Sequence, residues 1–337
     1  MDKKLVVSPS PHIHGAFSTK RLMGDVLIAL IPAFIVSVIV YGVDALVVTG
    51  VSVAACVAFE YLIQKYLLKG DCTIGNYSAV VTGVLLGFNL PSTLPVWMIV
   101  IGALVAIGVG KMSFGGLGCN PFNPALVGRV FLLISFPVQM TGFVTPAHVD
   151  SLSGATTTQV EINAETATDA VSGPTLLGYV KEALAGGSTT ADIAEKLSYN
   201  DMLLGFKSGS VGEIAALALL LGGAYLLGRG VITWQTPVCF VGTVFVLSLV
   251  LGQDAMRQVL SGGLLLGAFF MATDYVTAPQ TYWGRALFGI GAGLLTCLIR
   301  FYGSYAEGVS FAILFMNILT PYLSRWTQSK PLGGAKA

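Results

Sequence analysis

Ten stretches of about twenty mostly apolar residues are the feature of this chain that most restricts its fold. An α-helix of that length crosses the hydrocarbon core of a bilayer, where every backbone polar group must be hydrogen-bonded within the protein. With 54% hydrophobic and 10% charged residues, the composition excludes an ordinary soluble domain. We therefore predict an all-α polytopic membrane protein. Its spans are expected near residues 23–42, 45–67, 72–91, 95–113, 122–138, 209–228, 231–252, 256–276, 283–303 and 306–323.

The first five and the last five predicted spans share features in the same order. Gly24-Asp25 opens the first span as Gly212-Glu213 opens the sixth, and a Gly-Ala pair precedes a basic residue in both the fourth and the ninth. Five crossings reverse the direction in which a second copy begins, which gives the inverted-repeat plan of many transporters. We expect two inverted five-helix repeats, 23–138 and 209–323, with functional groups where they meet.

Lysine and arginine in the short loops predict the orientation in the membrane. Most of them fall on one side together with the N-terminal segment 1–22 and the C-terminal tail 324–337, so we expect both of these in the cytoplasm. The segment 139–208 then faces outward.

This outward segment is about seventy residues long and mostly polar, with three lysines against eight acidic residues. A loop of such length is usually either functional or disordered. It holds two hydroxyl-rich motifs, Ser-Gly-Ala-Thr at 153–156 and Ser-Gly-Pro-Thr at 172–175. A threonine between small residues is open to a bulky group, and Gly173 lets the backbone approach a phosphate. Thr175 could equally cap a helix expected over 176–184.

Residues 111–125 cannot form a continuous helix, because three glycines and two prolines interrupt them. Non-helical backbone at membrane depth is tolerated where it is packed in protein or lines a polar cavity. Asn120 and Asn123 could supply amide contacts to a ligand there, with Lys111 at the start of the segment. A purely structural re-entrant turn is the alternative. Pro124 suits the first turn of the fifth span.

A second polar interruption, 270–279, follows the eighth predicted span. Asp274 lies in it between Thr273 and Thr277, and could cap a helix or serve an ion or cofactor site.

Acidic residues inside predicted spans are candidates for function, because placing them in lipid is costly. Asp25 and Glu213 occupy corresponding positions in the two predicted repeats. With Glu60 they are our candidates for an ion pathway, and Glu307 is a further intramembrane acid. Each could instead lie at the interface within reach of water.

Other classes of function have little support. His12 and His14 lack a third metal ligand, the five cysteines are isolated, and we predict no metal site. The motifs of hydrolases and ATPases are missing, which leaves no catalytic residue to assign. The net charge of +1 gives no electrostatic case for nucleic acid.

Four motifs in order along the chain resemble the family of D subunits of the Rnf electron-transport complex, homologous to the B subunit of the sodium-pumping NADH:quinone reductase. The motifs lie at residues 8–23, 114–125, 209–213 and 267–274, and the resemblance covers essentially the whole chain. It implies a urea-transporter-like fold of ten spans in the bacterial cytoplasmic (inner) membrane. It also implies a subunit of an ion-translocating ferredoxin:NAD oxidoreductase, not catalytic alone, that works with Rnf subunits of the A, B, C, E and G types.

The resemblance further implies FMN joined through its phosphate to a threonine of an outward-facing Ser-Gly-Ala-Thr motif. A second, noncovalent flavin (riboflavin) near the broken helices and a sodium- or proton-coupled step are implied as well. Here the literal motif ends at Thr156, whereas the later copy, with Ser172, Gly173 and Thr175, has proline in place of alanine. Its position before a helix-like stretch and the sixth span favours Thr175, and Thr156 is the rival attachment site.

A solute channel or transporter of the urea-transporter type is the competing interpretation. Inverted repeats and broken helices fit it equally well, but it leaves the threonine-bearing loop without a purpose. A purely structural scaffold is a third possibility.

Overall fold

The computed structural model describes residues 18–69, 73–144, 172–173, 177–178, 199–205, 207–303, 305 and 307–328, the pair 172–173 by its backbone only. The described chain is helical apart from a short antiparallel pairing of β1 (Phe143–Val144) with β2 (Ser172–Gly173). This confirms the predicted all-α class.

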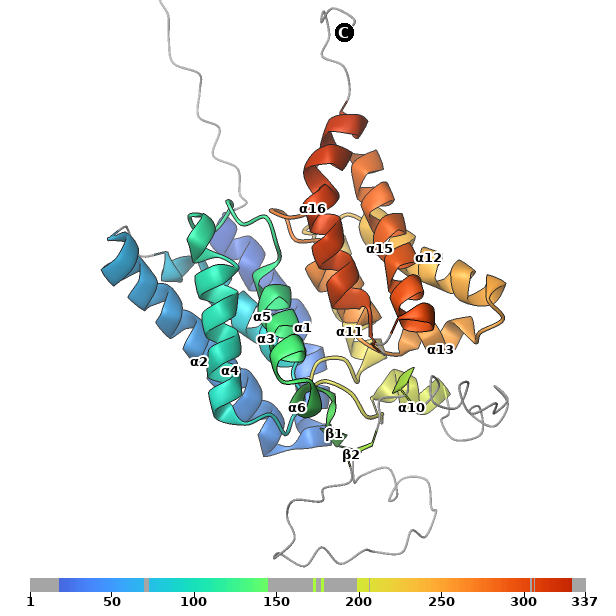
Figure 1. Ribbon diagram of the computed structural model, residues 1–337, viewed down its shortest axis with the longest axis horizontal. Helices are drawn as coiled ribbons and strands as arrows, with labels where there is room; N and C mark the ends of the chain where they lie inside the picture. Colours follow the sequence, from blue (N-terminus) through green and yellow to red (C-terminus); the bar gives the residue numbers. More distant parts are fainter. Residues whose placement is uncertain are drawn as a thin grey trace, which may run out of the picture.

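The helices form two groups that lie side by side (Figure 1). The first group contains α1 (Thr19–Tyr41), α2 (Val43–Leu62) with η1 (Ile63–Leu68), η2 (Ile74–Asn76), α3 (Ser78–Phe88), α4 (Val96–Leu104) with η3 (Val105–Val109) and η4 (Met112–Phe114), α5 (Pro124–Ser135) and α6 (Pro137–Thr141). The second contains α10 (Tyr199–Leu204), α11 (Ala216–Gly228), α12 (Gln235–Val250), α13 (Ala255–Leu260), α14 (Leu264–Leu266) with η5 (Gly267–Met271), α15 (Tyr282–Tyr302) and α16 (Val309–Thr327). Helices α1 and α11 pack together where the groups meet.

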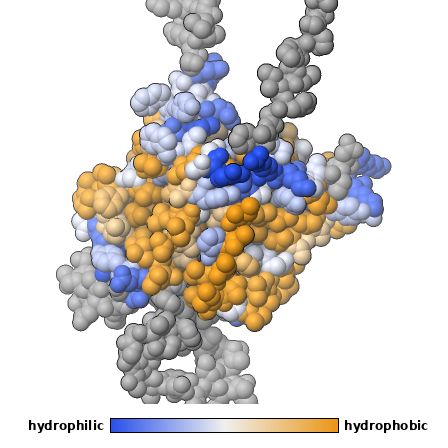
Figure 2. Space-filling view, turned by 180° about the vertical axis from the view of Figure 1, so that it is seen from behind, coloured by the Kyte–Doolittle hydropathy of each residue, from blue (hydrophilic) through white to orange (hydrophobic). Residues whose placement is uncertain are grey.

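Four described helical stretches are long and apolar enough to cross a membrane: Thr19–Tyr41, Val43–Leu68, Val96–Phe114 and Tyr282–Tyr302. Many of their outward side chains are apolar; Leu67 and Trp283, for example, are 79% and 77% exposed. Figure 2 shows a broad hydrophobic surface on one face of the molecule, with hydrophilic residues above it. A surface of this kind is suited to lipid or to other membrane subunits.

Each predicted span contains a helix, but several helices are shorter than expected. The third span is reduced to α3, and the eighth is divided into α13, α14 and η5. The sixth begins late, because residues 207–215 approach α11 without forming a helix. A hydropathy window does not register these interruptions, because it averages their few polar residues and glycines with the apolar residues around them.

The non-helical segment 207–215 takes its hydrogen bonds from the end of α3. Val211 N donates to Leu90 O at 3.0 Å, and Gly212 N donates to Phe88 O at 2.9 Å. A Cβ atom at Gly212 would lie 2.3 Å from the Phe88 ring, so the close approach requires glycine. These bonds satisfy two of its backbone amides inside the protein, as the membrane demands.

A buried ion pair joins the two groups of helices. Arg129 of α5 contacts Glu307, just before α16, and donates to Ser310 Oγ at 2.6 Å. The other oxygen of Glu307 accepts from Gly263 N at 2.6 Å. The side chains of Arg129 and Glu307 are 8% and 14% exposed. A pair held in this way is costly to break from one side only, because the remaining charge stays buried.

We therefore predict that Arg129→Met destabilises the purified protein by about 3–5 kcal/mol, seen as a lower thermal unfolding midpoint. The double variant Arg129→Met/Glu307→Gln should recover part of the loss, because it removes both charges of this pair. Arg325→Met, at an exposed position on α16, is the control. A midpoint for Arg129→Met equal to that of the control would contradict the role assigned to this pair.

Candidate functional site

The first interruption predicted from the sequence is present between η4 and α5. Gly115, Gly116 and Gly118 have φ of 106°, 95° and 95°, in the left-handed region that favours glycine. Pro124 is the first residue of α5, and Asn123 caps that helix by accepting from Ala125 N at 3.1 Å. The glycines end one helix and the Asn-Pro pair begins the next, as the sequence indicates.

The second interruption lies between η5 and α15. Thr273 Oγ1 donates back to Phe269 O at 2.6 Å, and Asp274 accepts from Thr277 Oγ1 at 3.3 Å. The cap of α15 is Thr281, which accepts from Gly284 N at 3.1 Å. Asp274 is therefore held within its own turn and does not cap α15.

Asn123 connects the two interruptions. Its side-chain oxygen caps α5, while its Nδ2 donates to Met271 O, at the end of η5, at 3.3 Å. In its preferred amide orientation Asn317 of α16 accepts from Asn123 N at 3.2 Å. One residue thus holds the broken backbone of the first group against two elements of the second.

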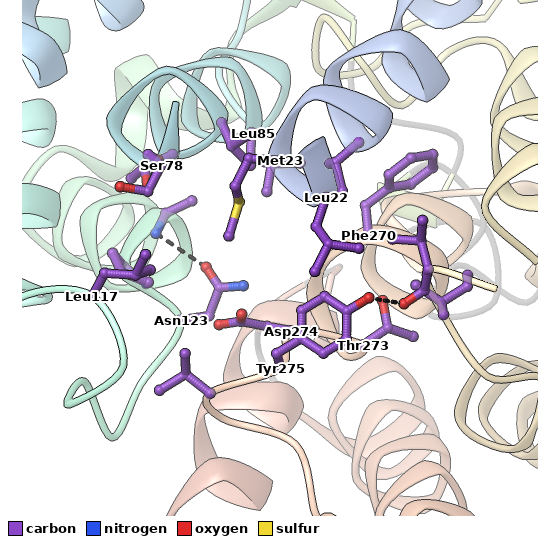
Figure 3. Close-up of a pocket in the computed structure, with 18 of the residues that line it drawn as sticks. Leu22, Met23, Ser78, Leu85, Leu117, Asn123, Phe270, Thr273, Asp274 and Tyr275 are labelled. Carbon is purple, nitrogen blue, oxygen red and sulfur yellow. Dashed lines mark hydrogen bonds between the residues drawn. The ribbon is translucent and has the colours of Figure 1, made fainter. Parts of the chain in front are cut away.

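A cavity lies between the interruptions, with about 770 Å³ of empty space that includes space open to solvent. Leu22, Met23, Leu226, Phe269 and Phe270 are among its apolar walls, and Ser78, Thr82, Lys111, Asn120, Asn123, Thr273 and Asp274 are its polar residues. Figure 3 shows the Asn123 amide and the Asp274 carboxylate next to each other, with Met23 and Leu22 on the opposite side of the cavity.

The structure brings together five residues that the sequence proposed separately, since Lys111, Asn120, Asn123, Thr273 and Asp274 all line this cavity. Ser78 and Thr82 of α3 were missed. Nothing in the sequence of an apolar span distinguishes a cavity-lining hydroxyl from one that bonds its own helix.

The acids proposed for an ion pathway lie outside the cavity lining. Asp25, on α1, accepts from Tyr225 of α11 at 3.1 Å and lies 3.5 Å from the Arg229 guanidinium. Glu213 accepts from Ser210 Oγ at 2.7 Å. Glu60, on α2, forms an ion pair with Lys111.

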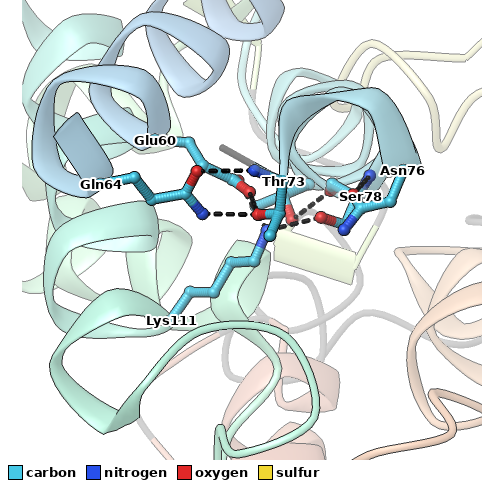
Figure 4. Close-up of polar contacts among 7 residues, drawn as sticks. Glu60, Gln64, Thr73, Asn76, Ser78 and Lys111 are labelled. Carbon is cyan, nitrogen blue, oxygen red and sulfur yellow. Dashed lines mark hydrogen bonds and ion pairs between the residues drawn. The ribbon is translucent and has the colours of Figure 1, made fainter. Parts of the chain in front are cut away.

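Glu60 and Lys111, both in the first group, are partners. Lys111 Nζ lies 2.6 Å from Glu60 Oε2 and 2.7 Å from Ser78 Oγ, so α2 and α3 both contact the interruption through it (Figure 4).

The proposed attachment threonines, Thr156 and Thr175, lie outside the described residues. Of the motif that contains Thr175, the backbone of Ser172 and Gly173 is described as β2, where Gly173 pairs with Phe143.

The lining of the cavity combines apolar with polar side chains. Its walls are apolar and aromatic, and amides, hydroxyls and an ammonium group stand among them. Asn120 is 4% exposed, and its Oδ1 accepts no hydrogen bond from the described part of the chain. A buried acceptor of this kind needs an N–H or O–H donor, which a ligand can supply.

Fold and cavity together define an α-helical integral membrane protein with a cavity between two interrupted helices. The chain belongs to the NQR2, RnfD, RnfE family, whose profile matches residues 6–333. The resemblance seen in the sequence motifs is thus confirmed over nearly the whole chain.

Three relatives show the same relationship. The chain is 42% identical to the D subunit of the Na(+)-translocating ferredoxin:NAD(+) oxidoreductase complex of Acetobacterium woodii, over 98% of this chain and 96% of that protein. It is 40% identical to the D subunit of the proton-translocating ferredoxin:NAD(+) oxidoreductase complex of Clostridium ljungdahlii, over 97% and 96%. It is 36% identical to the D subunit of the ion-translocating oxidoreductase complex of Pectobacterium atrosepticum, over 97% and 98%.

The two roles of Asn123 can be separated by substitution. Asn123→Ser keeps an acceptor that caps α5 but loses the donor to Met271 O, and Asn123→Ala loses both. We predict that the thermal unfolding midpoint falls in the order wild type, serine, alanine. The free energies of unfolding of the two variants should differ by about 1 kcal/mol, because only the serine variant keeps the cap. Equal midpoints for the two variants would contradict the capping role of Asn123.

Proposed function

We propose that this chain is the D subunit of an ion-translocating ferredoxin:NAD+ oxidoreductase (Rnf) complex, in which it holds flavin and relays electrons between its partner subunits. The observation that carries the proposal is the near full-length match to D subunits of such complexes. Those relatives favour a redox subunit over a solute channel. The partners are the other Rnf subunits of the A, B, C, E and G types in the bacterial cytoplasmic membrane.

The first cofactor in this proposal is FMN, bound covalently through its phosphate to Thr175, with Ser172 and Gly173 in the same motif. Described residues on both sides of Thr175 support this choice. The backbone of Gly173 pairs with β1. Leu177 is buried, and its Cδ1 would lie 2.8 Å from a Cβ atom added at Gly262. The motif is therefore flanked by contacts to both groups of helices. Thr156, in the literal family motif, is the rival site.

The second cofactor in this proposal is a noncovalent flavin, riboflavin, in the cavity between the interruptions. The apolar walls suit the faces of the ring, and Lys111, Asn120, Asn123, Thr273 and Asp274 suit its polar edge and side chain. The unpartnered Asn120 Oδ1 matches the ring N–H. A bound flavin supplies one- and two-electron chemistry, and the protein fixes the position of the ring and excludes water from it.

The proposed topology places residues 23–138 and 209–323 as two inverted repeats, with 1–22 and 324–337 in the cytoplasm and 139–208 outside. One interruption in each half, and their meeting at one cavity, support it. This arrangement resembles transporters whose sites lie between discontinuous helices.

A coupled cation step completes the proposal. Asp25, at the contact of α1 and α11, and Glu213, in the non-helical approach to α11, are acids that a cation could meet at the boundary between the halves. Glu60 is the third candidate and would act together with Lys111. Because the relatives from Acetobacterium woodii and Clostridium ljungdahlii are named after different cations, the proposal covers both Na⁺ and H⁺.

Thr175→Ala should abolish the flavin fluorescence that stays with this subunit after denaturing electrophoresis, whereas Thr156→Ala should leave it unchanged. Mass spectrometry of the two loop peptides gives an independent readout. The reverse pattern would move the attachment to Thr156. Flavin on neither peptide would overturn the covalent assignment.

A further inference from the structure

Lys111 brings a positive charge to the wall of the cavity. The residue is 1% exposed, and its ammonium group contacts Glu60 Oε2 at 2.6 Å and Ser78 Oγ at 2.7 Å. Among the described residues these are its only partners, so one of its three N–H donors is left over. Lys111 and Ser78 line the cavity, whereas Glu60 does not.

Glu60 is held on the side of Lys111 away from the cavity. Its second oxygen accepts from Thr73 Oγ1 at 3.1 Å. Gln64 fixes Thr73 in turn, by donating to the Thr73 hydroxyl at 2.5 Å and accepting from its backbone N at 2.9 Å (Figure 4). Both carboxylate oxygens are thus engaged, and the carboxylate offsets the cost of burying the ammonium.

This geometry produces a local dipole whose positive end faces the cavity. The field of a neutral ion pair falls off with distance, but a ligand that touches the ammonium is much closer to the positive charge than to the negative one. A ligand that becomes more negative when it is reduced is therefore favoured in its reduced form.

We propose that Lys111 sets the reduction potential of the flavin in this cavity. This inference rests on the proposed flavin site. The spare N–H donates to an electronegative atom at the ring edge. The ammonium charge stabilises the negative charge that the ring gains when it takes one electron from a reduced one-electron carrier of the complex, which is itself oxidised by one electron. Glu60 is a positioning residue that holds Lys111 and reduces the effect of its charge on the reduction potential.

The test is a redox titration of the noncovalent flavin in the purified complex, in the threonine variant that lacks the covalent flavin of this subunit. Glu60→Gln removes the opposing charge and should raise the potential. Lys111→Met/Glu60→Gln removes the ammonium without leaving an unpaired carboxylate and should lower it. Each shift should correspond to at least a tenfold change in the equilibrium constant of reduction, about 59 mV for a one-electron couple.

Lys65→Met removes the same charge from an exposed position on η1 and is the control for a nonspecific charge effect. Shifts of opposite sign in the two test variants, with none in the control, support the proposal, because a merely structural role would not reverse sign. If the potential shifts with the same sign in both test variants, or does not shift although flavin is still bound, the role of Lys111 is overturned. The flavin site itself is not contradicted by that result. A wild-type complex that releases no flavin from this subunit on denaturation overturns the site as well. If the double variant does not accumulate, an unchanged potential in Glu60→Gln alone overturns the proposal.

Discussion

The hydrogen bonds of Asn123 are the interaction on which the rest of this architecture depends. Two helices are interrupted at membrane depth, and the exposed backbone ends must find partners inside the protein. Asn123 meets that requirement for both interruptions, since it caps α5 and donates to the last carbonyl of η5. The cavity lies between the two broken segments because this contact holds them side by side without a continuous helix to fill the space.

Buried charges follow the same constraint. Arg129 and Glu307 join the two groups of helices, and Glu60 and Lys111 join α2 to the first interruption. Each pair carries additional hydrogen bonds from hydroxyls or backbone amides, which a buried ion pair needs to offset its desolvation. The two pairs differ in one respect. Arg129 and Glu307 lie away from the cavity lining, whereas Lys111 lines the cavity and is available to a ligand.

Hydropathy and backbone chemistry predicted different parts of this molecule. Apolar length located a helix in every expected span, and the glycines and prolines of 111–125 located the first interruption. Helix ends were missed where a few glycines and polar residues interrupt an otherwise apolar window, as before α11. The meeting of Asn123 with Met271 and of Glu60 with Lys111 could not be derived, because such contacts depend on how helices distant in sequence pack. The threonines of the outer loop remain a prediction from sequence.

The central claim is that the cavity between the two interruptions is a flavin site. A density map of the assembled complex, purified with its flavins retained, tests it most directly. We expect a three-ring planar feature between the Asn120 and Asn123 amides and the Phe269 and Phe270 side chains, with its polar edge toward Lys111. A map in which side chains or lipid fill this cavity, with every flavin of the complex located elsewhere, would contradict it.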